Sequence, residues 1–412
     1  MKTKFPLAYL LSGIALFSSC NSNAKNGEEV SGTDTTSYPS VEKNPANTDY
    51  KPAFAGQTRI KGVKTATAYE VKILSRDLKS PWGLVSLPDG RLLITEKEGT
   101  LRIATADGKL SEPITGLPPV DAKGQGGLLG IALDPSFASN RMVYWTFSHK
   151  VDGKNLTAVG KGKLADDEKS IQNAQIIYQA TPAYNGTLHY GSRILFDKTG
   201  NIIFSTGERS DLETRPQAQD LKSALGKIIR ITPEGKPAPG NPFEGNANAR
   251  PEIYSYGHRN VQGLALHPET GDLWETEFGP KGGDEVNIVK PGKNYGWPTI
   301  TYGLEYSGAK IGEAIQQKDG LEQPVYYYDP VISPSGITFY SSNTIPEWKN
   351  NLFIAALSGT HIARLVIKDN KVVGEERLLA DQGQRFRAVI EGKNGELFAV
   401  TDAGWLVKVA KK

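Results

Sequence analysis

The feature that most constrains the fold is a pattern that recurs six times along the chain. A turn containing Gly or Asn is followed by an apolar strand and then by a small or acidic residue. The apolar segments that follow the turns are 91–96, 141–146, 201–206, 272–277, 352–357 and 396–402. Their unequal spacing is compatible with four-stranded blades that carry insertions of different lengths. The pattern therefore predicts an all-β fold, a six-bladed β-propeller with four-stranded antiparallel blades.

Composition agrees with many turns and short strands, because the chain of 412 residues contains 44 Gly and 25 Pro. A β-sandwich or a pair of β domains is the alternative to the propeller. The formal net charge is only +3 and there is no basic tract, which argues against a nucleic-acid partner. The single Cys excludes an internal disulfide.

The first twenty residues have the pattern of an export signal. Lys2 and Lys4 precede an apolar run over residues 5–17, which is too short to span a bilayer comfortably. Two serines then precede Cys20, and small residues before a Cys resemble a bacterial lipobox, in which the thiol is acylated. This predicts an exported lipoprotein, periplasmic or anchored to the outer membrane through Cys20. A plain secretory signal with a chance Cys is the alternative.

Three regions follow from these patterns. Residues 1–19 are predicted to be a lipoprotein signal peptide. Residues 20–65 are rich in polar residues, Gly and Pro, which predicts a flexible tether. Residues 66–412 carry the strand pattern and are predicted to form the propeller.

Common catalytic motifs are absent from the sequence. The five His residues include no pair at a zinc-binding spacing, and there is no P-loop, G-x-S-x-G or dinucleotide fingerprint. A propeller binds ligands where loops of several blades converge, so its site residues should lie far apart in sequence.

Seven segments in order carry a family resemblance. They are 124–130 (GQGGLLG), 188–193 (LHYGSR), 256–264 (YGHRNVQGL), 279–287 (GPKGGDEVN), 294–298 (NYGWP), 333–336 (SPSG) and 385–387 (RFR). Together they resemble the soluble sugar dehydrogenases that depend on pyrroloquinoline quinone (PQQ). The resemblance is greater to the aldose sugar dehydrogenase branch of the glucose/sorbosone dehydrogenase family, and it covers roughly residues 70 to 410.

The resemblance implies a catalytic base and a set of cofactor contacts. His189 matches the base, a role that suits imidazole because its pKa lies near neutral pH. Arg259 matches a residue near the quinone oxygens, where a cation would stabilise charge on the reduced cofactor. The implied cofactor contacts are Gln125, Arg259, Asn260, Tyr306, Ser358, Arg385 and Arg387. Arg385 and Arg387 are two apart, so on a strand both guanidinium groups would face one side and suit carboxylates.

The resemblance also implies calcium. Backbone carbonyls at Gly279 and Pro280 match ligands of the cofactor's calcium, and Glu285 with Tyr295 matches a second, structural calcium. Oxygen donors of this kind are what calcium prefers.

Three positions depart from the family pattern. Ser358 stands where many members have a Lys that contacts PQQ, so that contact is weaker or replaced. Asp329 stands where many have an aromatic residue, which predicts a more polar substrate wall. Glu208 occupies a position where Asp is frequent.

The leading hypothesis is therefore a PQQ- and Ca²⁺-dependent oxidoreductase that converts aldose sugars at C1 to lactones and is reoxidised by an external electron acceptor. One alternative is a non-catalytic exported propeller that binds carbohydrate or protein. Another is a calcium-dependent, lactonase-like hydrolase, which would need several carboxylate and Asn ligands facing the channel.

Overall fold

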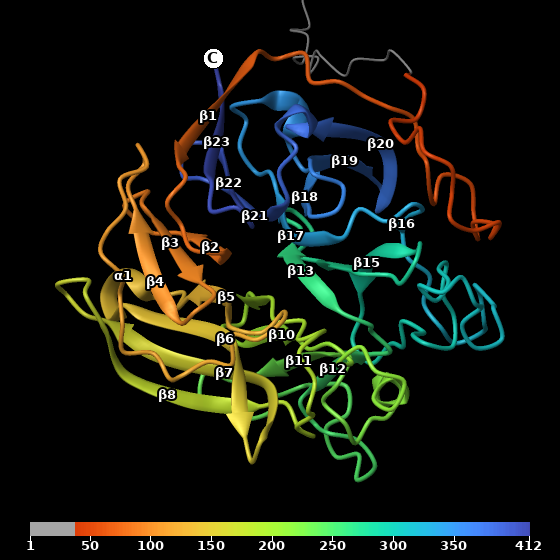
Figure 1. Ribbon diagram of the computed structural model, residues 1–412, viewed down its shortest axis with the longest axis horizontal. Coiled ribbons are helices and arrows are strands. Elements are labelled where there is room, and N and C mark those ends of the chain that lie inside the picture. Colours follow the sequence, from red (N-terminus) through yellow and green to blue (C-terminus); the bar gives the residue numbers. More distant parts are fainter. Residues whose placement is uncertain (1–37) are drawn as a thin grey trace, which may run out of the picture. The chain divides into compact units, whose positions relative to one another are not determined.

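Six antiparallel sheets surround a common centre in the computed structural model, which describes residues 38–412 (Figure 1). The predicted signal peptide and Cys20 lie outside the described residues. Five sheets have four strands, and the sheet β2-β3-β4 has three. In that sheet Leu110 and Ile114 form isolated bridges to Ala104 and Leu101, at the outer edge where a fourth strand would lie. The six-bladed propeller is thus confirmed.

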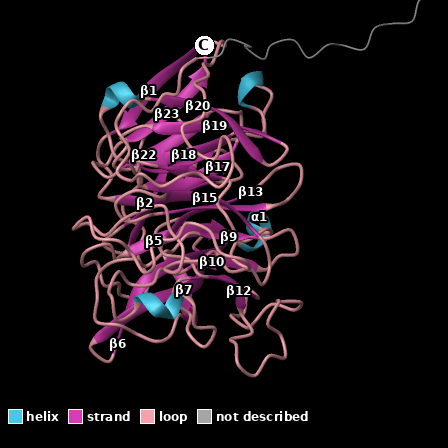
Figure 2. Cartoon of the chain, turned by 90° about the vertical axis from the view of Figure 1, so that its right-hand side faces the viewer, coloured by secondary structure: helices cyan, strands magenta, loops and turns pink. Residues whose placement is uncertain are grey.

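The strands are β1 (Tyr69–Ser75), β2 (Pro81–Ser86), β3 (Leu92–Glu96), β4 (Thr100–Ala104), β5 (Leu128–Leu133), β6 (Met142–Val151), β7 (Lys154–Leu164), β8 (Ile171–Gln179), β9 (Ile194–Phe196), β10 (Ile202–Ser205), β11 (Lys227–Ile231), β12 (Ile253–Tyr256), β13 (Val261–Leu266), β14 (Leu273–Glu277), β15 (Asp284–Val289), β16 (Tyr326–Tyr328), β17 (Pro334–Phe339), β18 (Leu352–Ala356), β19 (Ile362–Lys368), β20 (Lys371–Leu378), β21 (Phe386–Glu391), β22 (Leu397–Thr401) and β23 (Leu406–Lys411). Helical structure is short: α1 (Phe137–Asn140), η1 (Arg215–Ala218), η2 (Pro346–Trp348) and η3 (Ala380–Gln382). Figure 2 shows these few turns at the margins of the strands. Within residues 38–412, none of the helices has the length and apolar character needed to cross a membrane.

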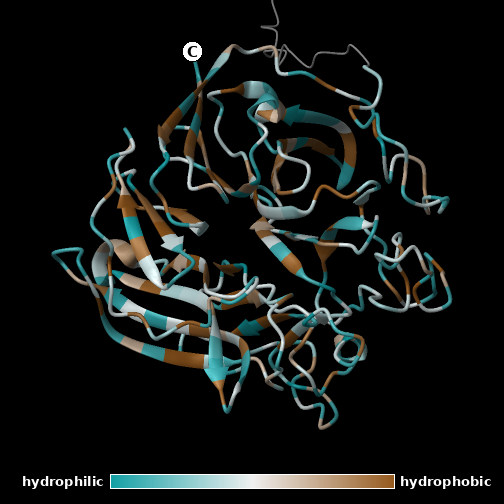
Figure 3. Ribbon diagram, in the orientation of Figure 1, coloured by the Kyte–Doolittle hydropathy of each residue, from teal (hydrophilic) through white to brown (hydrophobic). Residues whose placement is uncertain are grey.

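Each of the six repeated segments forms the second strand of its sheet. These strands are β3, β6, β10, β14, β18 and β22. They read as nearly continuous apolar runs because both of their faces are buried. On β3, Leu93 packs into the core shared with the β5–β8 sheet, whereas Leu92 and Ile94 pack into the core shared with β21 and β22. Brown segments on the strands of Figure 3 mark such residues. The apolar repeat in the sequence therefore arises because each second strand packs between two neighbouring sheets.

The ring is closed by the first strand. β1 pairs with β23 in the sheet β1-β23-β22-β21, with Tyr69 opposite Lys411 and Ile73 opposite Val407. The last sheet thus contains strands from both ends of the described chain.

Residues 38–65 differ from the predicted flexible tether, because they pack on the propeller as a strap. Val63 donates a backbone hydrogen bond to the Glu375 carbonyl, and Glu375 donates one to Lys61, so the strap covers part of the edge of β20. Thr65 binds the Glu376 carboxylate through its backbone N–H, at 2.8 Å, and through its hydroxyl. The polar composition that predicts a flexible tether here supplies hydrogen bonds to a sheet edge.

The strap also contacts Asp329 and explains why this residue is buried. Its carboxylate accepts hydrogen bonds from the backbone N–H groups of Asn47, at 2.7 Å, and Thr48, at 3.0 Å. Arg59 donates to the Asp329 carbonyl at 2.7 Å. Asp329 is buried and does not line the central cavity, so the expectation that it makes the substrate wall more polar is wrong.

Candidate active site

A cavity of about 480 Å³ lies at the centre of the ring, and all six sheets or the loops leading into them contribute to its lining. It brings together five residues singled out from the sequence: Gln125, His189, Tyr306, Arg385 and Arg387. They come from four sheets: Gln125 precedes β5, His189 precedes β9, Tyr306 lies between β15 and β16, and the Arg pair lies at the start of β21, as expected of a propeller site. The other lining residues are Ser80, Pro81, Trp82, Lys97, Gly124, Gly126, Gln262, Phe278, Ser333, Leu357 and Asp402.

His189 is held in a fixed orientation at the cavity wall. Its Nδ1 lies 2.6 Å from Oε1 of Glu208, and its backbone N–H donates to Oε1 of Gln125 at 2.9 Å. Among the described residues no partner contacts Nε2, the other ring nitrogen. Both members of the pair are buried, with exposed fractions of 4% for His189 and 1% for Glu208. A carboxylate on Nδ1 keeps the proton on that nitrogen and leaves Nε2 as a proton acceptor.

The environment of His189 keeps the imidazole neutral. Burial and the charge of Arg259 lower its pKa, the Glu208 carboxylate opposes both effects, and the net result is a pKa of about 4. A neutral imidazole can accept a proton from a substrate hydroxyl across the neutral pH range.

Arg259 stands beside the cavity, in the wall of a much narrower recess that shares Phe278 with it. Its Nη1 donates to the carbonyl oxygens of Phe278, at 3.0 Å, and Gly279, at 2.9 Å. Its Nε is buried without a partner, and its guanidinium lies 5.2 Å from the ring centre of Trp297. The cation is therefore only partly satisfied, which favours interaction with an additional acceptor.

Arg385 and Arg387 share one carboxylate on the cavity wall. Nε of Arg385 donates to Asp402 at 2.9 Å, and Nε of Arg387 donates to the other oxygen at 3.0 Å. Arg387 also reaches Oε1 of Gln262 at 3.4 Å. Asp402 thus holds two guanidinium groups side by side with their remaining N–H groups available, an arrangement suited to a carboxylate-bearing ligand.

Three other predicted contacts lie in different settings. Tyr306 borders the cavity but is 71% exposed, so its ring can cover a ligand. Asn260 is buried below the wall, where Oδ1 accepts from Gly191 at 3.0 Å and Nδ2 has no partner. Ser358 does not line the cavity, and its hydroxyl lies 2.8 Å from that of Ser333, which does.

The four predicted calcium ligands, Gly279, Pro280, Glu285 and Tyr295, all line the narrow recess. β14 and β15 place acidic and amide side chains in register there, with Glu275 opposite Asn287 and Glu277 opposite Glu285. Burial, together with the charge of Glu277, raises the pKa of Glu285 to about 8, and the same two causes raise the pKa of Glu275.

Two oxygens in this cluster, Oε2 of Glu275 and Oδ1 of Asn287, are buried without a hydrogen-bond partner. Buried carboxylates and orphaned oxygens are the donors that a hard cation would satisfy. The residues present therefore fit calcium.

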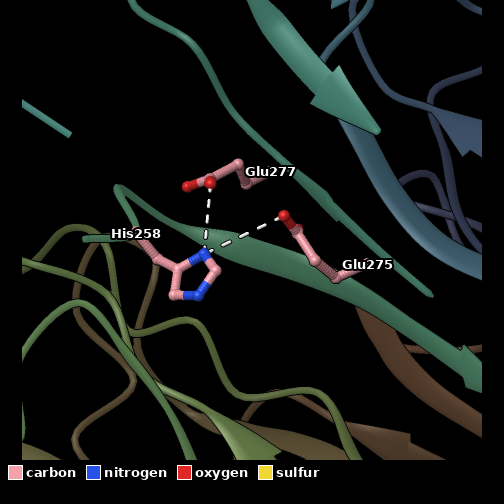
Figure 4. Close-up of side chains that lie close together, drawn as sticks. All are labelled: His258, Glu275 and Glu277. Atoms are coloured by element: carbon pink, nitrogen blue, oxygen red, sulfur yellow. Dashed lines mark hydrogen bonds and ion pairs between the residues drawn. The ribbon is translucent and has the colours of Figure 1, made fainter. Parts of the chain in front are cut away.

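His258 belongs to this buried cluster and does not line the cavity. Nδ1 lies 3.3 Å from Glu277 and 3.9 Å from Glu275. Figure 4 shows both carboxylates on the same side of the ring nitrogen. Its other nitrogen lies 2.8 Å from the Ser255 hydroxyl, and its ring stacks on Tyr295 with 4.7 Å between ring centres.

Sequence reasoning missed the roles of several residues at the cavity. Glu208 was noted as a departure from the family pattern but not as the partner of His189. Asp402 and Lys97 lie in none of the seven segments, whereas Gln262 lies in 256–264 but was not singled out. The signal for Asp402 was available, because an acidic residue after the sixth repeated strand falls beside the Arg pair of the adjacent strand.

The fold and this site define a β-propeller with a buried His–Glu pair at the wall of a cation-lined cavity. Residues 78–408 match the family model described as "Glucose / Sorbosone dehydrogenase". The chain is 42% identical to the aldose sugar dehydrogenase YliI of Escherichia coli (strain K12), over 83% of this chain and 93% of that protein.

Solved structures agree with the match to the family. A crystal structure of a glucose dehydrogenase superposes with a TM-score of 0.80 at 44% identity, covering 83% of this chain and 99% of that one. The PQQ-bound aldose sugar dehydrogenase of Streptomyces coelicolor has a TM-score of 0.69 at 31% identity, covering 84% of this chain and 99% of that one. The chain belongs to the glucose/sorbosone dehydrogenase family and is an oxidoreductase that acts on sugars.

Proposed function

We propose that this sugar dehydrogenase oxidises aldoses at C1 to lactones, using PQQ and calcium, and passes the electrons to an external acceptor. The observation that carries the proposal is the buried His189–Glu208 pair at the wall of a cavity that also presents Arg385 and Arg387. The PQQ-bound form of the Streptomyces relative supports the choice of cofactor.

His189 takes the proton in the proposed reaction. Oxidation of an aldose at C1 removes a hydride from the carbon and a proton from its hydroxyl. Nε2 of His189 accepts that proton, and the Glu208 carboxylate stabilises the imidazolium that forms. When bound, PQQ supplies the two-electron acceptor for the hydride. The proton later leaves His189 to solvent, which restores the neutral base.

The cofactor would be held by residues already in place. Arg385 and Arg387 would bind carboxylates, Gln125 and Asn260 would offer polar contacts, and Tyr306 would cover the ring. The cavity carries three cations against the single carboxylate Asp402, so the lining fits an anionic cofactor. Arg259 would face the negative charge that develops on the cofactor as it is reduced.

Calcium would be held by the carbonyls of Gly279 and Pro280, where it would polarise the quinone, and by Glu285 and Tyr295 as a structural ion. Arg259 already donates to the Gly279 carbonyl. A carbonyl oxygen has two lone pairs, so Gly279 can accept this hydrogen bond and still offer a lone pair to a cation.

A hydrolase of the lactonase type is not favoured. Among the described residues that line the cavity, Asp402 is the only carboxylate, and both of its oxygens are engaged by Arg385 and Arg387. Such a site lacks the several acidic ligands that a channel-facing catalytic calcium needs.

The test is reconstitution of the purified protein with PQQ and calcium, followed by reduction of a dye acceptor with a panel of aldoses. We expect turnover in the wild type and none in His189→Ala, with PQQ binding retained. His149→Ala, on β6 and outside the cavity lining, is the matched control and should be active. No PQQ-dependent dye reduction with any aldose would overturn the proposal and favour a binding function.

We also propose that the protein is exported and anchored through an acylated Cys20. Mass spectrometry of membrane-expressed protein should show a lipid-sized mass increase on Cys20. The Cys20→Ser variant should lose the increase and be released from the membrane fraction. An unmodified Cys20 in the membrane fraction would contradict the anchor.

A further inference from the structure

Lys97 lies in the turn between β3 and β4 and lines the central cavity together with Arg385 and Arg387. Its Nζ donates to the backbone carbonyl of Gly124 at 2.7 Å. Within residues 38–412 no carboxylate lies within ion-pair distance of it, whereas Arg385 and Arg387 are both paired with Asp402. Lys97 is thus a cavity cation whose charge is not neutralised by a direct partner.

The charge of the cavity wall is unbalanced. The lining includes three cations, Lys97, Arg385 and Arg387, and one carboxylate, Asp402, so its formal charge is 3 − 1 = +2 with His189 neutral. A further cation, Arg193, is half-buried beside Trp82 of the lining, with its guanidinium 4.2 Å from the ring centre. An uncompensated positive wall is costly unless an anionic ligand occupies the cavity.

The sheets do not contribute equally to this charge. The sheet β17–β20 contributes Ser333 and Leu357 to the lining and no charged residue. The two Arg residues come from the sheet that contains β21, and Lys97 comes from the sheet β2–β4. These two sheets are neighbours, because their inner strands β2 and β21 lie against each other. Positive charge therefore reaches the cavity from two neighbouring sheets.

The contact made by Lys97 also connects it to the residues that hold His189. Its acceptor is Gly124, the residue before Gln125, and the Gln125 side chain accepts the hydrogen bond of His189. A carboxylate is a stronger partner for an ammonium group than a neutral carbonyl is. The flexible stem of Lys97 allows Nζ to turn from the Gly124 carbonyl toward a ligand without backbone movement.

We propose that Lys97 is a third cationic ligand of the anionic cofactor and binds a carboxylate that Arg385 and Arg387 do not reach. The inference rests on the proposed function, because it takes the ligand to be a polycarboxylate. It adds a residue that carries no family motif and that comes from a different sheet than the two Arg residues.

The experiment is equilibrium titration of the calcium-loaded apoprotein with PQQ, followed by the absorbance of the cofactor. Lys97→Gln should weaken PQQ binding about 10- to 100-fold, the usual loss when a charged hydrogen-bonding partner is removed. Lys97→Arg should recover most of the affinity. The matched control is Lys123→Gln, which removes the same charge from an exposed position on the Gly124 loop outside the lining.

Two further readouts separate ligand binding from a structural role. The thermal midpoint of the apoprotein should be unchanged in Lys97→Gln, because Nζ binds a single carbonyl on a solvent-accessible loop. The PQQ affinity of this variant should also fall less steeply with added salt than that of the wild type, since one charge contact is missing.

The failures are distinguishable. Absence of PQQ binding by the wild type would overturn both the proposed function and this inference. If the wild type binds PQQ and the PQQ affinity of Lys97→Gln equals that of Lys123→Gln, only the role of Lys97 would be overturned.

Discussion

Replacing Glu208 by Gln should separate proton transfer from binding. The change keeps the size of the side chain and removes its charge at a contact of 2.6 Å with Nδ1 of His189. In the free enzyme the imidazole is neutral, so little binding energy depends on the carboxylate. In the transition state the imidazole becomes positively charged, and the carboxylate then stabilises a full charge.

The magnitude follows from Coulomb's law. For unit charges about 4 Å apart and an effective dielectric constant of about 20, the attraction is about 4 kcal/mol. Both groups are almost fully buried, so solvent screening is weak. A loss of about 4 kcal/mol from the transition state lowers kcat by roughly 10³-fold.

The assay is steady-state dye reduction with the reconstituted protein, together with PQQ titration and thermal denaturation of each variant. We expect kcat to fall by roughly three orders of magnitude while the PQQ affinity and the KM for the sugar stay near those of the wild type. Glu213→Gln, on the exposed part of the same loop, is the matched control and should be active. If Glu208→Gln folds, binds PQQ and retains kcat within about fivefold of the wild type, the assignment of Glu208 is refuted.

Four further predictions concern the pH dependence of activity, the pH dependence of stability, the strap and calcium. The value of kcat/KM should be constant from about pH 5 to 7, and it should fall below pH 5 with an apparent pKa of about 4, because His189 must be unprotonated to act as a base. A midpoint near pH 6.5 in the pH–rate profile would contradict the effect of burial on His189. The same lowered pKa means that the contribution of His189 to stability is present above about pH 6.5 and is lost as pH falls toward 4, which acid unfolding curves would reveal. A chain starting at residue 66 should melt at least about 5 °C lower and self-associate in light scattering, because it loses the hydrogen bonds of the strap and exposes the β20 edge. Glu285→Gln should reduce the rise in thermal midpoint on adding calcium to chelator-treated protein, because the structural ion loses a ligand. An unchanged rise would place the structural calcium elsewhere.

The propeller could be predicted because its second strands are buried on both faces. Segments such as Leu92–Glu96 are apolar throughout and follow turn residues, so the signal survives in a single sequence. The strap could not be predicted in this way. Residues 38–65 bind through backbone groups and polar side chains to a sheet edge formed by Glu375 and Glu376, about 310 residues away. Composition alone does not distinguish such a segment from a disordered one.

The site was predictable only where a motif marked it. His189, Arg385 and Arg387 lie in recognisable segments, and the structure brings them to one cavity. Lys97 and Glu208 contact Gly124 and His189, which come from other segments of the chain, and no motif in the sequence expresses either contact. Asp402 differs, because it follows the sixth repeated strand and lies beside the Arg pair of the adjacent strand, so the repeat itself indicates its position.

The pairing of β1 with β23 has a consequence for how the chain folds and how it can be modified. These strands are more than 330 residues apart, so the ring cannot close until the last residues have left the ribosome. Such distant pairing predicts slow folding with open intermediates. Tyr69 also lies opposite Lys411, so the chain enters and leaves the ring at the same end of this strand pair. The Ala68 carbonyl accepts a hydrogen bond from the backbone N–H of Lys412, so a reporter fused after Lys412 would emerge next to Ala68. Tension applied between Ala68 and Lys412 would open the β1–β23 pair one hydrogen bond at a time.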